Sequence, residues 1–260
     1  MRTAGIWASI LLGVMLAAGA LAESLDRPLR LGYAEPASPP YQLAHDRNPP
    51  GISFDILNEV VNRLGLSVEY VRWPNKRVLF ELGKGRLDGA FIYSWKPDRE
   101  ALAVYPMKAE QPDHALRMAT LTYYFYSLKV NRFSWHGQRF EGLTLPIGAN
   151  QGYSVADDLR EAGYEVLEAR DTAYLFRLLR EGRIALAAHQ SVVVDAWSRL
   201  AGDDLKDIER LSLPISTKDY FLLFSHDFMQ RQEKLARRIW QTIGEVRDPV
   251  TEAVRGRYGQ

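Results

Sequence analysis

The chain has 260 residues, with 33 basic and 32 acidic side chains, and it contains no cysteine. Without cysteine it can form neither a disulfide bond nor a thiolate nucleophile, so its stability must come from a hydrophobic core. The balanced charge argues against a nucleic-acid partner, since phosphate binding needs a basic excess or a basic stripe.

The first residues predict a secretory signal peptide, 1–22. Arg2 supplies a short positive region, residues 6–21 are apolar and rich in small side chains, and Ala20-Leu21-Ala22 is typical of a cleavage site. A membrane anchor is the alternative, but the run is short for a span of about 20 residues and polar residues follow it at once. Cleavage would leave equal numbers of acidic and basic residues. An exported chain without disulfides suggests a bacterial periplasmic protein, long enough for one large domain or two modest ones.

The first half of the mature chain alternates strands with helices. The expected order is a strand at 29–34, a helix in "GISFDILNEVVNRLG", a strand in "SVEYVRW", a helix at 76–84 and a strand in "RLDGAFIYS". Ser53 or Asp55 can cap the first helix, and Gly65 suits the left-handed position at its end. This β-α-β-α-β order with short connections is typical of a parallel sheet flanked by helices.

The second half repeats this order, and one helix-to-strand corner is nearly repeated in sequence. The segment "VLFELGKGRLDGAF" matches "LFRLLREGRIALAA" about a hundred residues later, when the two are aligned on Gly85 and Gly182. Each copy ends a helix with glycine and begins a strand, and open α/β sheets bind ligands beyond the carboxyl ends of such strands. We therefore expect two α/β halves that face each other across a cleft. A last strand in "LPISTKDYFLLFSHD" and an amphipathic helix at 228–247 complete the pattern.

From residue 29 to residue 246 the sequence resembles solute-binding protein family 3, the periplasmic amino-acid-binding type that serves ABC importers. Six segments carry the resemblance, in the family's order: "LRLGYAEPASPPY", "GISFDILNEVVNRLG", "GKGRLDGAF", "SWKPDRE", "LPIGANQGYSVADDL" and "LREGRIALAAHQSVV". The resemblance implies an α/β fold of periplasmic-binding-protein type II. In that fold two lobes, each a mixed, mainly parallel sheet flanked by helices, are joined by two crossing strands, here near 121–130 and 216–223. Lobe 1 would comprise 23–125 and 220–260, and lobe 2 would comprise 126–219.

The resemblance also implies a ligand site on the first lobe. The family has a serine or threonine five residues before an arginine, and both hold the ligand's carboxylate; in "SWKPDR" these are Ser94 and Arg99. An arginine suits this role because its planar fork makes two parallel charge-assisted hydrogen bonds. A surface ion pair of Arg99 with Asp98 or Glu100 is the alternative. Lys96 stands where the family prefers threonine, and it either adds a second positive charge or points to solvent.

On the second lobe, "NQGYSVADD" corresponds to the family's glycine loop. Gly152 and Ser154 are the candidate ligand contacts, since backbone N–H groups and a hydroxyl at a helix N-terminus form an anion site. Ser154 can equally serve as the helix cap, and the two roles are compatible. We expect Tyr153 to lie against the ligand, together with Tyr41 and Tyr93.

The family's ammonium-binding aspartate corresponds to Gln190 in this sequence. A neutral amide cannot form a charge-assisted pair with an ammonium group, so a standard α-amino acid fits less well unless Glu35, Asp171 or another carboxylate substitutes. The neighbouring His189 is either a titrating ligand contact or a buried strand histidine. Residues 107–120 are longer than the family's usual connection, and we interpret them as a surface insertion.

These residues predict binding without chemistry. We expect a monomeric periplasmic protein that closes around a small carboxylate-bearing solute, amino-acid-like or an organic acid, for the membrane subunits of an ABC importer or for a sensor. The alternative is a periplasmic lyase similar to cyclohexadienyl dehydratase, which needs a general acid over the substrate. No carboxylate stands clearly at a cleft position of the second lobe, so we expect no catalytic residue and no enzyme. Scattered histidines without HExxH spacing and the lack of a G-x-S-x-G motif lead us to expect no metal, no cofactor and no serine hydrolase.

Overall fold

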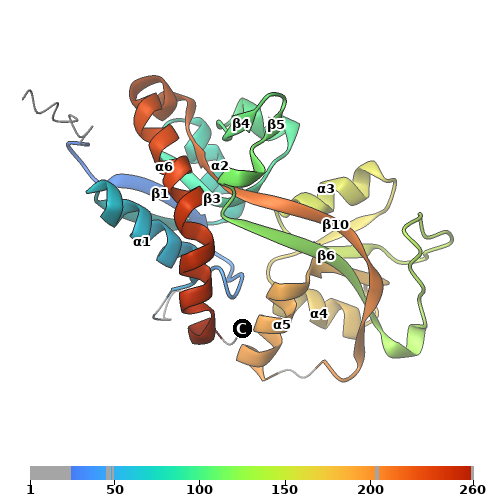
Figure 1. Cartoon of the computed structure of the whole chain (residues 1–260). Helices are drawn as coiled ribbons and strands as arrows, with labels where there is room; N and C mark the ends of the chain where they lie inside the picture. The colour runs from blue at the N-terminus through green and yellow to red at the C-terminus, as the bar shows by residue number, and fades with distance from the viewer. Residues whose placement is uncertain (1–24, 45–47, 49, 203–204, 259–260) are drawn as a thin grey trace, which may run out of the picture.

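The computed structural model of the chain describes residues 25–44, 48, 50–202 and 205–258 (Figure 1). The predicted signal peptide lies outside the described residues. No helix within these ranges combines the length and the apolar character that crossing a membrane requires.

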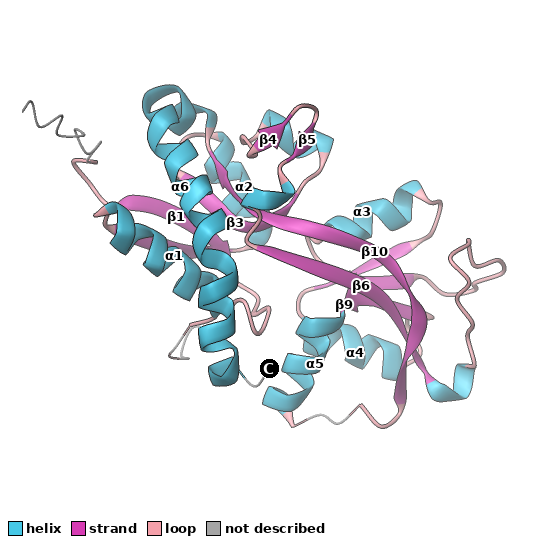
Figure 2. Ribbon diagram, in the orientation of Figure 1, coloured by secondary structure: helices cyan, strands magenta, loops and turns pink. Residues whose placement is uncertain are grey.

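Two α/β lobes lie side by side and are joined by two long antiparallel strands (Figures 1 and 2). Lobe 1 contains β1 (Leu29–Ala34), α1 (Ile52–Leu64), β2 (Val68–Trp73), α2 (Asn75–Gly83), β3 (Gly89–Ser94) and the long helix α6 (His226–Val254). Lobe 2 contains β7 (Ile147–Asn150), α3 (Ser154–Glu161), β8 (Val166–Ala169), α4 (Thr172–Arg180), β9 (Leu186–Gln190) and α5 (Ser191–Ala201). The joining strands are β6 (Ala119–Leu128) and β10 (Ile208–Phe224). Both predicted lobe boundaries fall inside these strands, and the division of the chain at those residues stays a prediction.

One curled eight-stranded sheet runs through both lobes in the order β2-β1-β3-β10-β6-β9-β7-β8. In lobe 1, β1 pairs in parallel with β2 and β3, and in lobe 2, β7 pairs in parallel with β8 and β9. The joining strands pair antiparallel with each other and with the nearest strand of each lobe. The two halves of the sheet therefore correspond strand by strand: β2-β1-β3-β10 from one edge matches β8-β7-β9-β6 from the other.

The repeated helix-to-strand corner is a structural repeat. Gly85 after α2 and Gly182 after α4 both adopt the left-handed conformation, with φ of 66° and 63°. Each lobe adds a matching glycine in its central strand, Gly32 in β1 and Gly148 in β7. A Cβ at Gly32 would overlap Leu87, and a Cβ at Gly148 would overlap Ile184, which is the residue aligned with Leu87 in the sequence match. The same close approach of corner to strand is thus built twice.

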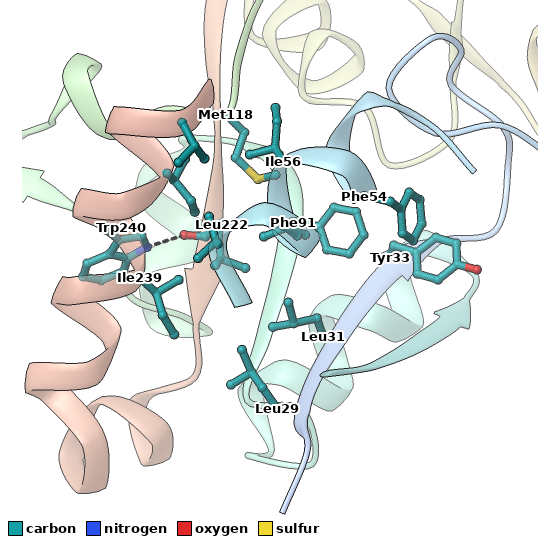
Figure 3. Close-up of a cluster of buried hydrophobic side chains, with 14 of the residues drawn as sticks. Leu29, Leu31, Tyr33, Phe54, Ile56, Phe91, Met118, Leu222, Ile239 and Trp240 are labelled. Carbon is teal, nitrogen blue, oxygen red and sulfur yellow. Dashed lines mark hydrogen bonds between the residues drawn. The ribbon is translucent and has the colours of Figure 1, made fainter. Parts of the chain in front are cut away.

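The main hydrophobic core of lobe 1 lies between the sheet and helices α1 and α6 (Figure 3). Trp240 of α6 is almost fully buried and donates its indole N–H to the backbone oxygen of Leu222 at 2.7 Å, so its one polar atom is satisfied. Tyr33 meets Phe54 edge-to-face with ring centroids 5.1 Å apart. Burial of each such side chain stabilises the fold by about 1.5–3 kcal/mol. The predicted apolar stripe of α6, which includes Leu235, Ile239, Trp240 and Ile243, is confirmed as core.

Three local features differ from the sequence-based expectation. Helix α1 starts after Gly51 without a side-chain cap, because Gly51 holds the cap position while Ser53 and Asp55 lie inside the first turn, where Asp55 accepts a hydrogen bond from the Tyr258 hydroxyl. Helix α5 was not expected, since no turn residue separates it from β9. Helix α6 continues past Pro249 to Val254, although proline removes one helical hydrogen bond, because its last turns pack on the core of lobe 1.

The predicted surface insertion, residues 107–120, forms a short hairpin of β4 (Met107–Lys108) and β5 (Gln111–Pro112), followed by a 3-10 turn. The turn lies against α6, where Arg247 donates to the backbone oxygens of Ala115 and Arg117. The hairpin itself projects from lobe 1 beside the start of β6 (Figure 2).

Candidate ligand-binding site

A cavity of about 50 Å³ lies between the lobes, at the carboxyl ends of the parallel strands. It is lined by both lobes and both joining strands: Ala34, Pro36, Ser38, Gln42, Asn75, Phe91, Ile92, Tyr93, Ser94, Arg99, Tyr123, Gly152, Tyr153, Ser154, Gln190 and Tyr220. Seven of the eight predicted ligand residues are brought together here. Tyr41 is outside this lining, and its side chain packs against apolar clusters of both lobes.

Arg99 is buried at the wall of the cavity, with 7% of its surface exposed. It lies on the 3-10 turn Pro97–Ala101, which follows β3 closely enough for the guanidinium to turn back onto the strand end. One nitrogen donates to the backbone oxygen of Ser94 at 2.7 Å and lies 3.3 Å from its hydroxyl. Another donates across the cleft to the backbone oxygen of Gly152 at 3.3 Å.

No carboxylate of the described residues forms an ion pair with Arg99. The alternative of a surface pair with Asp98 or Glu100 is not observed, and Glu100 instead accepts a hydrogen bond from the Trp95 indole at 2.7 Å. A buried cation without a counter-ion is energetically costly. The arrangement therefore favours an anion in the cavity.

The start of α3 forms the opposite wall. Ser154 is the first residue of the helix, and its hydroxyl lies 2.9 Å from that of Ser94 in the other lobe. Gly152 has a φ of 75°, and a Cβ there would lie 2.9 Å from the side-chain nitrogen of Asn75 in lobe 1. A glycine at this position thus permits the close approach of the two lobes.

Two lysines near the cavity are paired with carboxylates of α3. Lys96 is buried, and its amino group lies 3.1 Å from Asp157 and 3.7 Å from Glu161. Lys218 of β10 pairs with Asp158, and it also donates to Ser154 Oγ at 2.9 Å. Burial lowers the pKa of Lys218, and Asp158 opposes this shift. Lys96 therefore neither enters the cavity as a free charge nor points to solvent, but holds the lobes together.

Gln190 is the centre of a neutral hydrogen-bond network. Its amide nitrogen donates to the hydroxyls of Tyr123 at 2.9 Å and Tyr220 at 2.6 Å, and these hydroxyls lie 2.7 Å apart. Burial raises the pKa of both phenols, so both are uncharged. The amide oxygen of Gln190 is buried, and no donor reaches it from the part of the chain that the structure describes.

His189 is a buried strand histidine and is not part of the cavity lining. Its Nδ1 accepts a hydrogen bond from the backbone nitrogen of Gln190 at 2.8 Å, and its Nε2 lies 3.0 Å from Thr172 Oγ1. Burial lowers the pKa of His189 to about 4, so the ring stays neutral at mildly acidic pH. His189 therefore positions the backbone of Gln190.

The carboxylates that could have replaced the missing aspartate lie elsewhere. Asp171 caps α4 by accepting a hydrogen bond from the backbone nitrogen of Tyr174 at 2.7 Å. Glu35 lines a separate surface hollow near Lys76 and Arg170. No Asp or Glu is among the described residues that line the cavity.

Three residues that line the cavity were not predicted from the sequence: Tyr123, Tyr220 and Asn75. Both tyrosines lie in the segments that were expected to cross between the lobes, which was the one available signal. Tyr93 and Tyr153 do line the cavity as expected, and the Tyr93 hydroxyl and the Asn75 side-chain oxygen are buried with no partner from the described residues.

No family model matches the chain, and no curated protein matches its sequence. Solved structures do match it in fold. A histidine kinase sensor domain with similarity to periplasmic binding proteins has a TM-score of 0.72 at 17% identity, over 89% of this chain and 96% of that chain. The GluR0 ligand-binding core from Nostoc punctiforme, in complex with L-glutamate, has a TM-score of 0.67 at 14% identity, over 89% and 99%.

A third match is the ancestral amino acid-binding protein AncCDT-1, a precursor of cyclohexadienyl dehydratase. Its TM-score is 0.67 at 12% identity, over 90% of this chain and 96% of that chain. The chain thus has the two-lobed periplasmic-binding-protein type II fold of the family 3 solute-binding proteins, and the expected fold class is confirmed.

Proposed function

We propose that this protein is a periplasmic solute-binding protein that traps a small carboxylate-bearing solute between its lobes, without chemistry, for an ABC importer or a sensor. The observation that carries the proposal is the guanidinium of Arg99, which is buried against the cavity with no carboxylate partner among the described residues. A ligand carboxylate would supply the missing counter-ion and accept charge-assisted hydrogen bonds from the fork.

The contacts between the lobes support binding by closure. Ser94 meets Ser154, Arg99 reaches Gly152, and Lys96 pairs with Asp157, each across the cleft. A ligand carboxylate next to Arg99 would lie at the point where both walls converge, so it would add contacts to both lobes at once. A ligand that binds the closed arrangement more tightly than the open one shifts the protein towards the closed arrangement.

The test is calorimetry on ligand-stripped protein with a panel of organic acids and amino acids, guided by mass spectrometry of co-purified small molecules. We expect Arg99→Ala to lower the affinity for the tightest-binding carboxylate on the order of 100-fold, because a fork of charge-assisted hydrogen bonds is lost. Arg77→Ala is the matched control, since Arg77 is an exposed arginine of the same lobe outside the cavity. Equal affinity of Arg99→Ala and the wild type would refute the carboxylate assignment.

A lyase on the same scaffold is the second candidate, because one structure of similar fold is a precursor of cyclohexadienyl dehydratase. Such an enzyme needs a proton donor in the cavity. The described lining offers four phenols, and burial raises the pKa of each, which makes them weak acids: Tyr93, Tyr123, Tyr153 and Tyr220. Binding is therefore the better-supported function, and a new product in mass spectra after incubation with a bound solute would favour the lyase.

A further inference from the structure

We infer that the ligand is a short 2-hydroxy monocarboxylate, bearing a neutral hydroxyl where an α-amino acid bears its ammonium group. The inference rests on the proposed function and specifies the ligand class of the same cavity. It combines three properties of the described lining: its charge, the hydrogen-bond capacity around Gln190, and its size.

The charge of the cavity fits an anion and disfavours a zwitterion. Arg99 brings one buried positive charge, and no described lining residue brings a carboxylate. The nearby carboxylates Asp157 and Asp158 are taken up by Lys96 and Lys218. A carboxylate ligand balances Arg99, whereas an amino acid would add an ammonium group without any counter-ion, and burial of an unpaired charge is costly.

The hydrogen bonds around Gln190 require a group that both donates and accepts. The amide nitrogen donates its hydrogens to the two tyrosine hydroxyls, and the amide oxygen has no donor among the described residues. Each tyrosine keeps its own hydroxyl hydrogen, and the bond between Tyr123 and Tyr220 uses one of these two. The other phenol hydrogen has no acceptor among the hydrogen bonds of the described residues, so it can donate to a ligand.

A ligand hydroxyl satisfies both needs, because it donates to the Gln190 oxygen and accepts from the free phenol hydrogen. An ammonium group has three donors and no acceptor, so it would leave the phenol hydrogen without a partner. A ligand without any polar group at this carbon would leave the Gln190 oxygen unsatisfied as well, and an unsatisfied buried polar atom lowers the affinity.

The size of the cavity places the two polar groups close together. A single water needs at least about 10–15 Å³ of such space, so the cavity of about 50 Å³ holds the volume of only a few waters, and covalently bonded atoms lie closer together than waters do. A hydroxyl on the carbon next to the carboxylate meets this limit, and a long side chain does not. Glycolate and lactate are the simplest members of the class.

The experiment compares L-lactate, L-alanine and propionate, which differ only in the group on the carbon next to the carboxylate (a hydroxyl, an ammonium group or a hydrogen), by calorimetry on ligand-stripped protein. We expect lactate to bind about tenfold or more tightly than either of the others, because only lactate satisfies the Gln190 oxygen and the phenol hydrogen without a second positive charge. Alanine binding as tightly as lactate would overturn this inference and leave the proposed function standing. Propionate equal to lactate would overturn the role of the hydroxyl.

Absence of binding by all three ligands would also overturn the inference, and the wider carboxylate panel would then decide the proposed function separately. Two variants sharpen the outcome. Gln190→Asp restores a carboxylate for an ammonium group, and we expect it to reverse the ranking so that alanine exceeds lactate. Tyr220→Phe removes one hydroxyl of the network, and we expect it to weaken lactate while propionate changes little. An unchanged ranking in both variants would refute the assignment, because a purely structural role would alter all three affinities together.

Discussion

The two copies of the helix-to-strand corner share a backbone and differ in the residues just after the strand. In lobe 1, β3 ends at Ser94 and the chain turns so that Arg99 returns to the strand end. In lobe 2, β9 ends at Gln190 and the chain enters α5 directly. The first copy presents a cation and the second a neutral amide. A repeated scaffold thus sets where side chains converge, while the residues at and beyond each strand end set the charge.

The site has a cationic pole at Arg99 and a neutral pole at Gln190, and the two poles also differ in which segments hold them in position. Arg99 depends on backbone oxygens from both lobes, Ser94 and Gly152, so its position is tied to closure. Gln190 depends on lobe 2 and the joining strands, through His189 and the two tyrosines. We therefore expect perturbations of the cationic pole to change affinity most, and perturbations of the neutral pole to change stability or ligand preference.

The largest effect is expected from acid, through His189. Its pKa is about 4 in the folded protein against a usual value of 6.5, so the unfolded chain binds more protons between these values. Stability is fully present above pH 6.5 and falls as the pH drops towards 4, by on the order of 3 kcal/mol. Urea unfolding at pH 7 and pH 4.5 measures this difference.

His189→Gln is the control for the acid effect, since it removes the titrating ring and should flatten the pH dependence in this window. A wild-type stability that is the same at both pH values would contradict the buried, neutral state of the ring. Lobe 1 has no histidine at the end of β3, where Ser94 stands, so the acid effect distinguishes the two corners.

The next effect is expected at the cationic pole from Arg99→Lys. The charge is kept but the planar fork is lost, so we expect the affinity for the carboxylate ligand to fall about tenfold, less than for Arg99→Ala. The melting temperature of the ligand-free variants should stay within a few degrees of the wild type, because no described carboxylate loses its partner. Calorimetry and thermal unfolding of the three proteins check this order, and Lys and Ala variants of equal affinity would contradict the importance of charge.

A smaller loss is expected from Gly152→Ala, which pushes a methyl group against Asn75 across the cleft. Gly182→Ala is the matched control, because Gly182 has a similar φ of 63° but open space around its Cβ. Both variants should lose about 1 kcal/mol of stability through backbone strain. Only Gly152→Ala should lower ligand affinity, by several-fold, and an equal loss in both would show that the cleft contact is unimportant.

The smallest effect is expected from Lys96→Ala, which removes the pair with Asp157 and Glu161 between the lobes. Partly exposed ion pairs contribute about 0–1 kcal/mol, so the affinity should fall by no more than about fivefold. The difference from the wild type should shrink further in high salt, since salt screens the acidic partners. A difference that grows with salt concentration would count against an electrostatic contact.

The local part of the fold was predictable from the sequence. The apolar period of α1, the alternation of β2 and the glycines after α2 and α4 act over a few residues, and the structure shows these elements at the expected places. Helix α5 was missed because Ser191 follows the strand without a turn residue. The apolar residues at the start of α5 are similar in composition to the strand β9 before it. The end of the strand and the start of the helix are therefore decided by packing against the sheet.

The candidate site likewise has a part that was predictable from the sequence and a part that was not. Ser94 and Arg99 lie five residues apart on one strand end and one tight turn, so their proximity follows from local geometry. The pairing of Tyr123 with Tyr220 joins residues 97 positions apart and depends on the register of β6 against β10. The ion pair of Lys96 with Asp157 of α3 depends on how closely the two lobes approach each other.

The sequence by itself therefore determined the alternation of strands and helices, the repeated corner and the arginine beyond the first copy, because each depends on neighbours along the chain. Only the tertiary structure decided that Arg99 has no carboxylate partner among the described residues, that Gln190 joins two tyrosines, and that Glu35 lies outside the cavity. Those facts depend on distances between segments far apart in sequence, which strand pairing and lobe closure set.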